Sequence, residues 1–476
     1  IRITRRSPGT PPTAPGRWDT LPATLPRRMS SASFTAPGSP LPQRELLQRY
    51  TWPVLLSAAA RGLGFAAVIL VARGFGVEIF GELGFAHATV GYALTFAVFG
   101  LGIYGVREAV RHPESIGAVT STVIAIRLVL GAVAFLALAL LTLLPAFRPV
   151  AGLVLLYALT LFTSAISVFW VAQSRQRTDV LGLAAVATQA LYIGQVYLAL
   201  TLDLGKHAVP IALATSELVV ALGLLVWMRR RVAPLARPLA PAACGRILRR
   251  TAPLAGSQML RAVALGSDMV LLGLLVPMDR VGTYGAAYKL FVLGFTLVGL
   301  YVTVVLPHLV HHGTVSVRRM AREVGSLLRK LLLLAIPLAA LGVAVAPWGM
   351  RRLFGEEFAD ATTPMRLLVL ATLASLFGGH YRPAVLAMGE HRRDLANGAV
   401  SAGVHVAAKL VLIPFFGLTG AALGTLLGEV SFALASRVSL RRLEADEARR
   451  TVRADDLESA GFASGSTTGA GNPDFD

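Results

Sequence analysis

The chain has 476 residues, of which 55% are hydrophobic and only 15% are charged, with a formal net charge of +19 and a mean hydropathy of +0.64. A soluble protein of this length is rarely so apolar, so the composition excludes an ordinary soluble domain. The single cysteine excludes an intramolecular disulfide. Long apolar runs without a strand alternation predict an all-α polytopic membrane protein.

The first 42 residues differ from the rest of the chain. They are rich in Pro, Ser, Thr and Arg and have no apolar period, which is typical of a disordered tail. They also contain no apolar segment of the kind that a signal peptide needs. Because the chain begins with Ile1 and Met29 opens the motif "MSSASF", we expect Met29 to be the initiator.

About twelve apolar runs follow, and each approaches the ~20 residues that a helix needs to cross a bilayer. Their expected limits are 50–72, 80–104, 118–143, 149–172, 179–201, 207–228, 253–276, 282–306, 327–349, 363–388, 395–415 and 418–438. No connection is long enough for a soluble domain. The last residues, 441–476, begin as a charged helical stretch, "RRLEADEARR", and are then expected to be mostly disordered.

The loop charges predict the orientation. Arginines concentrate in alternate loops, such as "RRR" at 229–231, whereas the opposite loops carry few and one of them, "FGEEFAD", is acidic. The positive-inside rule then places both termini in the cytoplasm. We interpret the net charge as anchoring against anionic lipid rather than as a nucleic-acid surface.

Two segments about 200 residues apart resemble each other. A shift of about 200 residues aligns "RYTWPVLLSAAAR" (49–61) with "RTAPLAGSQMLR" (250–261) and matches Thr51 to Thr251, Pro53 to Pro253, Ser57 to Ser257 and Arg61 to Arg261. A shift of one residue more aligns "FGELGFA" (80–86) with "VGTYGAA" (281–287) and matches Gly81 to Gly282 and Gly84 to Gly285. Chance similarity between two spans rich in Leu, Ala and Gly is the alternative. A parallel repeat would divide the chain into an N-lobe (45–228) and a C-lobe (253–440), joined by a basic cytoplasmic loop (229–252).

Arg61 and Arg261 lie at matching depths in the first span of each lobe. A charge at the centre of a span costs on the order of 3 kcal/mol, so it usually faces a watery cavity. Two guanidinium groups there would make a cationic cavity suited to phosphate oxygens. Snorkelling or a structural ion pair is the alternative for any one such charge.

Other charges also fall within the apolar runs. Asp268 comes two helical turns after Arg261 and shares its face, which makes it a candidate partner. The full set of candidate substrate-binding residues is Arg61, Arg261, Asp268, Lys289 and Arg127, and Asp268 and Glu217 are candidates for ion coupling. Arg382, Lys409 and Glu429 are further charges within the spans.

Four motifs resemble those of one family of transporters. They are "ARGFGVEIFGELGFAHATVGYALTFAVFGLGIYGVREAVRH" (72–112), "SDMVLLGLLVPMDRVGTYGAAYKL" (267–290) with Pro307 after it, "LFGEEFADATTPMRLLVLA" (353–371) and "LIPFFGLTGAALGT" (412–425). In this order they resemble the bacterial oligosaccharide flippases, within the multidrug/oligosaccharidyl-lipid/polysaccharide exporter superfamily. The resemblance covers roughly residues 45–440.

The resemblance implies two six-helix lobes that form a V around a central cavity. It implies alternating-access transport of an undecaprenyl-pyrophosphate-linked glycan across the bacterial inner membrane, to its outer leaflet, for cell-surface polysaccharide biosynthesis. Expected partners are the lipid-linked oligosaccharide, membrane lipids and the polymerase and glycosyltransferases of the pathway. In related lipid II flippases, arginines of the first-span region meet the pyrophosphate, which implies the same role for Arg61 and Arg261. Those relatives have two additional C-terminal spans, so lipid II itself is the less expected substrate.

Other functions are less well supported by the sequence. We expect no enzyme activity and no cofactor, because no loop could hold a catalytic domain and the glycine-rich "GFGVEIFG" (74–81) is no Walker motif. A metal site at His308, His311 and His312 of "PHLVHH" is less expected than a plain interfacial role. The chief alternative is a cation-coupled multidrug exporter of the same superfamily, and a transport-inactive scaffold is the third.

Overall fold

The computed structural model describes residues 43–313, 317–388 and 390–465. The chain divides into two compact units, Ile1–Arg49 and Tyr50–Asp476. In the first unit only the start of a helix is described, so the expected disorder of residues 1–42 and the expected start at Met29 lie outside the described residues. The second unit contains the rest of this helix and all of the others.

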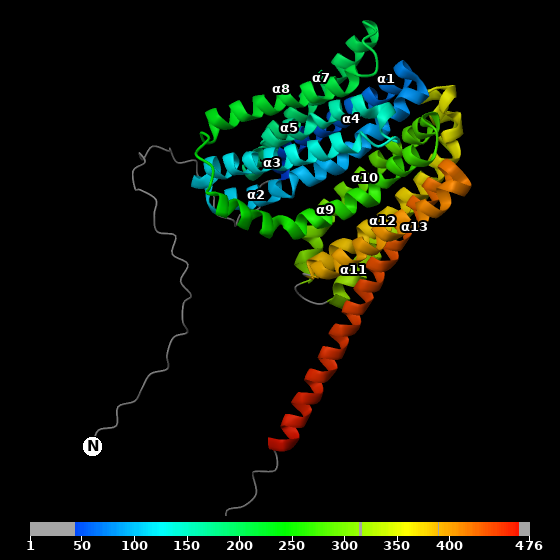
Figure 1. Ribbon diagram of the computed structural model, residues 1–476. Coiled ribbons are helices and arrows are strands. Elements are labelled where there is room, and N and C mark those ends of the chain that lie inside the picture. The colour runs from blue at the N-terminus through cyan, green and yellow to red at the C-terminus, as the bar shows by residue number, and fades with distance from the viewer. Residues whose placement is uncertain (1–42, 314–316, 389, 466–476) are drawn as a thin grey trace, which may run out of the picture. The chain divides into compact units, whose positions relative to one another are not determined.

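The helices up to residue 231 include one long helix with a break inside it. They are α1 (Gln43–Val98), α2 (Leu101–Arg111), α3 (Ile116–Leu141), α4 (Ala151–Ala158), α5 (Thr160–Ile166), α6 (Phe169–Ser174), α7 (Thr178–Thr201) and α8 (Ala208–Arg231) (Figure 1). Short 3-10 turns lie at Pro113–Ser115 and Arg148–Val150. At Gly76 the backbone of α1 has φ 79° and ψ 173°, which glycine adopts at little cost, so α1 contains two spans.

The remaining helices begin after an irregular segment. They are α9 (Pro241–Leu275), α10 (Met278–Gly313), α11 (Val317–Leu353), α12 (Thr362–Ala387) and α13 (His391–Gly465), with a 3-10 helix at Glu356–Ala361. α13 is broken at Gly417, where φ is 52° and ψ is −126°. This break falls between the two spans that the sequence predicts at 395–415 and 418–438.

The described residues form nine helices that are long and apolar enough to cross a membrane. Two of these, Leu55–Arg111 and Arg392–Arg449, contain the breaks at Gly76 and Gly417 and correspond to two expected spans each. If each of these two helices is counted as two spans, and α10 is added, the total agrees with the expected twelve spans. The predicted all-α polytopic membrane fold is confirmed.

Three details differ from the sequence prediction. The span expected at 149–172 is divided into α4, α5 and α6. The connection expected at 229–252 is shorter, because α8 runs to Arg231 and α9 already begins at Pro241, and proline is favoured in a first helical turn. The tail expected to be mostly disordered after residue 441 instead continues α13 as a helix to Gly465. Its Glu and Arg residues are good helix formers, and opposite charges three or four positions apart can pair.

The helices pack in two sets. Within residues 50–231, the N-terminal half, α3 packs on α5, α7 on α8 and α2 on α6. Within residues 241–449, the C-terminal half, α12 packs on α13 and α10, and α9 packs on α13 (Figure 1). The packing is consistent with the two lobes expected from the sequence.

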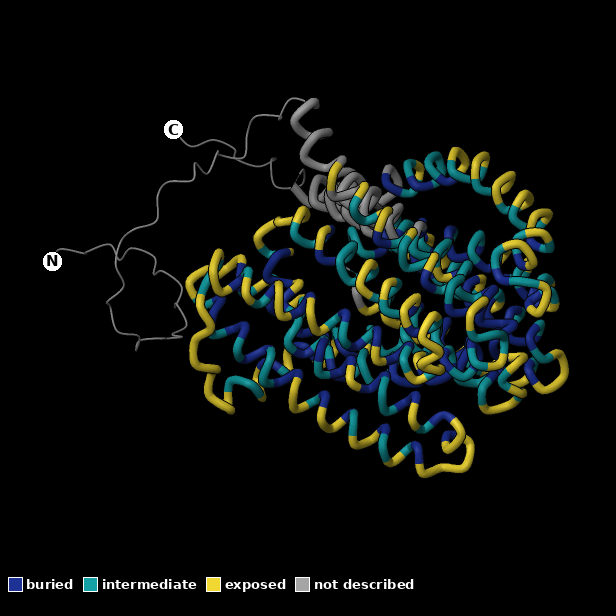
Figure 2. The backbone as a smooth tube through the Cα atoms, turned by 90° about the horizontal axis from the view of Figure 1, so that it is seen from above, coloured by how far each residue is buried: buried dark blue, intermediate teal, exposed yellow. Residues whose placement is uncertain are grey.

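Apolar side chains cover the outer sides of these helices. In α11, Leu333 is 79% exposed and Leu334 is 70% exposed, and long exposed stretches recur on outer helix faces in Figure 2. Exposed leucines in such numbers would be costly in water, but they are favourable in contact with lipid tails. The outer surface therefore fits a bilayer.

The two halves share a hydrophobic core at one end only. This shared core contains Phe80 and Phe85 from α1, Met269 and Leu272 from α9, and Phe354 after α11. The end next to it carries the acidic turn Glu356–Ala361, and we call it the acidic end. A second core belongs to the N-terminal half apart from Ile247, and a third belongs to the C-terminal half alone. The halves are thus joined at the acidic end.

Candidate functional site

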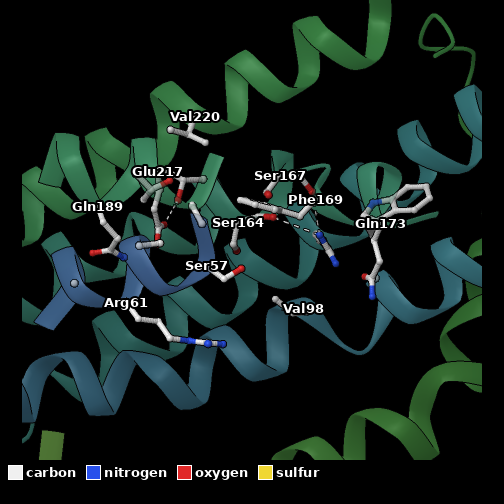
Figure 3. Close-up of a pocket in the computed structure, with 18 residues that line it drawn as sticks. Ser57, Arg61, Val98, Ser164, Ser167, Phe169, Gln173, Gln189, Glu217 and Val220 are labelled. Carbon is white, nitrogen blue, oxygen red and sulfur yellow. Dashed lines mark hydrogen bonds between the residues drawn. The ribbon is translucent and has the colours of Figure 1, made fainter. Parts of the chain in front are cut away.

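The larger candidate site is a polar cavity within the N-terminal half, which we call the N-cavity. It has a volume of about 710 Å³. Most of its polar lining consists of hydroxyl, amide and charged side chains, namely Ser57, Arg61, Arg127, Thr163, Ser164, Ser167, Gln173, Thr188, Gln189 and Glu217. Figure 3 shows Gln189 and Glu217 near one end of this cavity and Phe169 and Gln173 near the other.

Arg61 lies on α1 and faces the N-cavity (Figure 3). The side chain is half-buried, and among the described residues it has neither a hydrogen-bond partner nor an ion-pair partner. The nearby lining is polar, since it includes side chains such as Ser57 and Gln189. An arginine in this position keeps all of its N–H donors available for an anion.

Arg127 lies on α3 and is buried, with 6% of its surface exposed. Its Nη1 donates to the backbone carbonyls of Ser164 and Ser167, each at 3.4 Å. These carbonyls are available because α5 ends at Ile166 and Ser167 is extended (φ −69°, ψ 125°). A cation at a helix C-terminus is favourable, so Arg127 stabilises the break that divides this span. Its buried Nε has no hydrogen-bond partner within the described chain and is a second donor at the cavity.

Glu217 is the acid of the N-cavity. It lies on α8 and accepts a hydrogen bond of 2.6 Å from the hydroxyl of Thr163. It forms no ion pair with Arg61 or Arg127 in the part of the chain that the structure describes. With two arginines and one carboxylate in its lining, the N-cavity is cationic.

A second cavity lies in the C-terminal half, and we call it the C-cavity. Its volume is about 280 Å³. It is lined by Arg261, Ala264, Leu265, Phe295, Val298, Ser375, Gly379, Arg382, Gly398, Ser401, His405, Glu429 and Phe432. Arg261 therefore faces a different cavity from Arg61. From the sequence we expected Arg61 and Arg261 to line one shared cavity. In the structure, each of these two arginines lines a cavity of its own.

The Arg382 of the C-cavity already has a partner. Its Nε and Nη2 donate to the two carboxylate oxygens of Asp394, at 2.7 and 3.0 Å. Arg261, by contrast, is exposed to the cavity and pairs with no acid among the described residues. Arg261 is thus the C-terminal counterpart of Arg61 as a cation with free donors.

Asp268 contacts Lys409 and not Arg261. The carboxylate is fully buried and forms an ion pair with the equally buried Lys409 of α13. It also accepts hydrogen bonds from the hydroxyls of Tyr284 and Thr425, the latter at 2.7 Å. Lys409 in turn donates to Ser267 at 3.0 Å. Asp268 therefore finds its cation and its hydroxyl donors inside the C-terminal half, and none of these partners is Arg261.

The remaining candidates lie apart from the two cavities. Lys289 of α10 is not part of either cavity lining. The imidazoles of His308, His311 and His312 lie outside the described side chains. No cluster of three or more His, Cys, Asp or Glu side chains suited to a metal occurs in the described ranges.

The sequence reasoning missed two groups of site residues. One is the set of hydroxyl and amide side chains of the N-cavity, for which Thr160, Thr163, Ser164 and Ser167 at helical spacing were an available signal. The other is His405, which precedes Lys409 by four residues and so lies on the same helix face. A histidine and a lysine within one apolar run mark a polar interior face.

Contacts between the halves close the acidic end. Arg73 of α1 donates to the backbone carbonyls of Arg352 at 2.5 Å and Leu353 at 2.8 Å, at the C-terminus of α11. The backbone N–H of Val77 donates to the carboxylate of Glu357 at 3.4 Å. Both contacts join the N-terminal half to the C-terminal half beyond the shared core.

The fold resembles that of solved transporters of the MOP superfamily. A MATE-family multidrug resistance transporter of this superfamily, in an inward-facing conformation, superimposes with a TM-score of 0.69 and 16% identity over 83% of this chain and 98% of its own. The lipid II flippase MurJ, in an inward closed conformation, gives a TM-score of 0.64 with 14% identity over 83% of this chain and 90% of its own.

A third similar structure is a MOP superfamily transporter from Pyrococcus furiosus, described as having a binding pocket of reverse polarity that suggests a different function. Its TM-score is 0.54, with 17% identity over 84% of this chain and 96% of its own. Residues 46–311 match the family model described as "Polysaccharide biosynthesis protein", which is more than half of the chain, so the protein belongs to this family. No curated protein sequence matches it. The chain is a multi-pass membrane protein of the polysaccharide biosynthesis family.

Proposed function

We propose that the protein is a lipid-linked oligosaccharide flippase, which moves undecaprenyl-pyrophosphate-linked glycan units to the outer leaflet of the bacterial inner membrane. The observation that carries this proposal is the presence of an arginine without an acidic partner in each of two cavities, Arg61 in the N-cavity and Arg261 in the C-cavity. An unpaired guanidinium inside a membrane protein is costly unless water or an anionic ligand satisfies it. The diphosphate supplies such an anion.

The remaining lining of the N-cavity fits the sugar part of the substrate. Hydroxyl and amide groups such as Ser164, Thr188 and Gln189 offer both donors and acceptors, which suits the hydroxyls of a glycan. The polyprenyl tail would remain among the lipid tails. The membership in the polysaccharide biosynthesis family supports this substrate class.

The transport mechanism would be rocking of the two halves about their shared core. In the present state the acidic end is closed by the core and by the Arg73 contacts. Opening that end and closing the other would expose the cavities to the opposite side. An inside-negative potential would favour the outward movement of an anion by about 2.3 kcal/mol per charge per 100 mV. With the arginine-rich ends in the cytoplasm, this direction is export.

A cation-coupled exporter of small molecules is the second candidate function. The observation in its favour is Glu217, a carboxylate in the N-cavity that no cation neutralises within the described residues. Such an acid could bind a cationic drug or a coupling ion. The two arginines of the same cavity oppose a cationic substrate, and we therefore rank this function second.

Complementation of a flippase-null host tests the proposal. Arg61→Ala and Arg261→Ala should each abolish or sharply reduce surface glycan at normal membrane abundance, because neither arginine forms a direct ion pair or hydrogen bond with an acid among the described residues. Arg→Lys at either site should restore export only in part, since the ammonium keeps the charge but loses the planar fork. Full export by the double alanine variant at normal abundance would refute anion recognition by these residues.

A further inference from the structure

A buried chain of polar side chains runs from the C-cavity into the C-terminal half. It begins with Glu429, which is 5% exposed, and continues through His405 and Lys409 to Asp268, which are all fully buried. Glu429 and His405 line the C-cavity, whereas Lys409 and Asp268 lie behind them. The opposite charges of Asp268 and Lys409 cancel each other. The net charge of the buried chain therefore depends on the protons that His405 and Glu429 carry.

Lys409 determines how His405 holds its proton. The Nζ of Lys409 lies 3.3 Å from Nδ1 of His405. A lysine ammonium can only donate, so Nδ1 must accept, and the ring carries its single proton on Nε2. A second proton would have to sit on Nδ1, facing an ammonium that Asp268 and Ser267 hold in place. The free N–H of His405 is thus the one on Nε2, the ring atom that lies toward Glu429.

Glu429 is poorly satisfied by comparison. Its Oε1 lies 3.6 Å from Nε2 of His405, which is beyond hydrogen-bond length, and this Nε2 has no partner in the described chain. No other donor lies within hydrogen-bond distance of the Glu429 carboxylate among the described residues. A buried carboxylate without donors is unfavourable as an ion, unless a nearby cation compensates its charge.

The cation available for that purpose is Arg261. Several charged or titratable groups are packed around Glu429, namely Arg261 and Asp268 of α9, Tyr288 of α10, Arg382 of α12, and Asp394, His405 and Lys409 of α13. Arg382 pairs with Asp394, and Lys409 pairs with Asp268. This leaves Arg261 and Glu429 as the two unpaired charges of the same cavity, so the empty site is balanced only while Glu429 is ionised.

We propose that the ionised carboxylate of Glu429 competes with the anionic ligand for Arg261, so that Glu429 binds a proton when the ligand binds. In the empty C-cavity the ionised carboxylate balances the guanidinium. When a diphosphate binds to Arg261, it removes this compensation and adds negative charge, so the carboxylate takes one proton from water in the cavity and becomes a neutral carboxylic acid. Anion binding and proton binding at this site therefore favour each other. This inference rests on the proposed function, since it takes the ligand to be a lipid diphosphate.

Calorimetry on the purified full chain in detergent tests the coupling. The probe is synthetic farnesyl-diphosphoryl-glucose, a diester that lacks the second phosphate ionisation near about pH 6 and so contributes no proton of its own. Titrations in buffers of different ionisation enthalpy give the number of protons taken up. We expect up to about one proton per ligand, with an affinity that falls by up to about tenfold per pH unit above neutrality.

Two variants make the result specific. Glu429→Gln, which has the same shape without the charge, should bind the probe more tightly, take up no proton and show an affinity independent of pH. Asp446→Asn is the matched acid-to-amide change elsewhere on α13, outside the C-cavity lining, and should keep the wild-type pH dependence. Wild-type binding without proton uptake, or unchanged uptake in Glu429→Gln, would overturn the inference while leaving the proposed function intact. Complete absence of binding by the wild type would instead overturn the proposed function.

Infrared spectroscopy tests the same site without a ligand. Arg261→Ala removes the cation that balances Glu429, so a carboxylic-acid carbonyl band should appear in the ligand-free protein. The band should be absent from the Arg261→Ala, Glu429→Gln double variant. A ligand-free Arg261→Ala protein without this band would overturn the proton site whatever the outcome with the probe.

Discussion

Replacing Gly81 by alanine should destabilise the closed acidic end. A methyl carbon built on Gly81 would lie 1.9 Å from the carbonyl oxygen of Met278 and 2.7 Å from the nitrogen of Gly282. Because carbon and oxygen approach to about 3.3 Å, α1 and α10 would have to separate by roughly 1.4 Å. Both close neighbours are backbone atoms, which cannot rotate away.

The energetic cost follows from the packing of the shared core. Inserting one methyl group into a close-packed contact typically costs about 1–3 kcal/mol. This strain exists only while the two halves meet at Gly81, so it acts on the equilibrium between the closed and open acidic end. A shift of about 1–3 kcal/mol changes the ratio of the two states by about 5- to 150-fold. We expect Gly81→Ala to populate the open state and to impair transport with little loss of membrane abundance.

Electron–electron distance measurements between spin labels can follow this shift. Labels on cysteines introduced at Asp203 and Asp360, which are exposed residues of opposite halves, report the separation at the acidic end in a Cys244→Ala background. The wild type should give mainly the short distance and Gly81→Ala a longer one. Gly91→Ala is the matched control, because a methyl group on Gly91 in the same helix meets nothing within 4 Å. An unchanged distance distribution in Gly81→Ala, with full transport, would refute this reasoning.

Two further predictions concern the buried ion pair and the topology. Lys409→Met should lower thermal stability and abundance, because it leaves the fully buried Asp268 without its cation, a loss that typically costs about 3–5 kcal/mol. Addition of Asp268→Asn should restore much of the lost stability. A Lys409→Met protein of normal stability would contradict the pairing. In a Cys244→Ala background, an impermeant thiol reagent on intact cells should label a cysteine at Asp360 and not one at Arg230, and the opposite pattern would invert the predicted orientation.

The sequence predicted the helical membrane fold because apolar length is a direct requirement of the bilayer. It could not predict the division of the span at 149–172, since the break depends on Arg127 of another helix donating hydrogen bonds to the freed carbonyls. The identity of charged residues inside the spans was also evident. Their pairing was not, because Asp268 meets Lys409 across 141 positions of chain through tertiary packing alone, while the nearer Arg261 faces the C-cavity.

The internal repeat explains why some matched residues meet and others do not. Gly81 packs against the carbonyl of Met278, four residues before Gly282, and Gly282 packs against the carbonyl of Val77, four residues before Gly81. Such reciprocity is what a two-fold relation between the halves requires for residues next to the axis, as at an isologous interface. Arg61 and Arg261 are matched in the same alignment but line separate cavities, as residues away from an axis must. Under the proposed function, the glycines at the axis would provide a close contact about which the halves move, and the arginines would provide one anion site in each half.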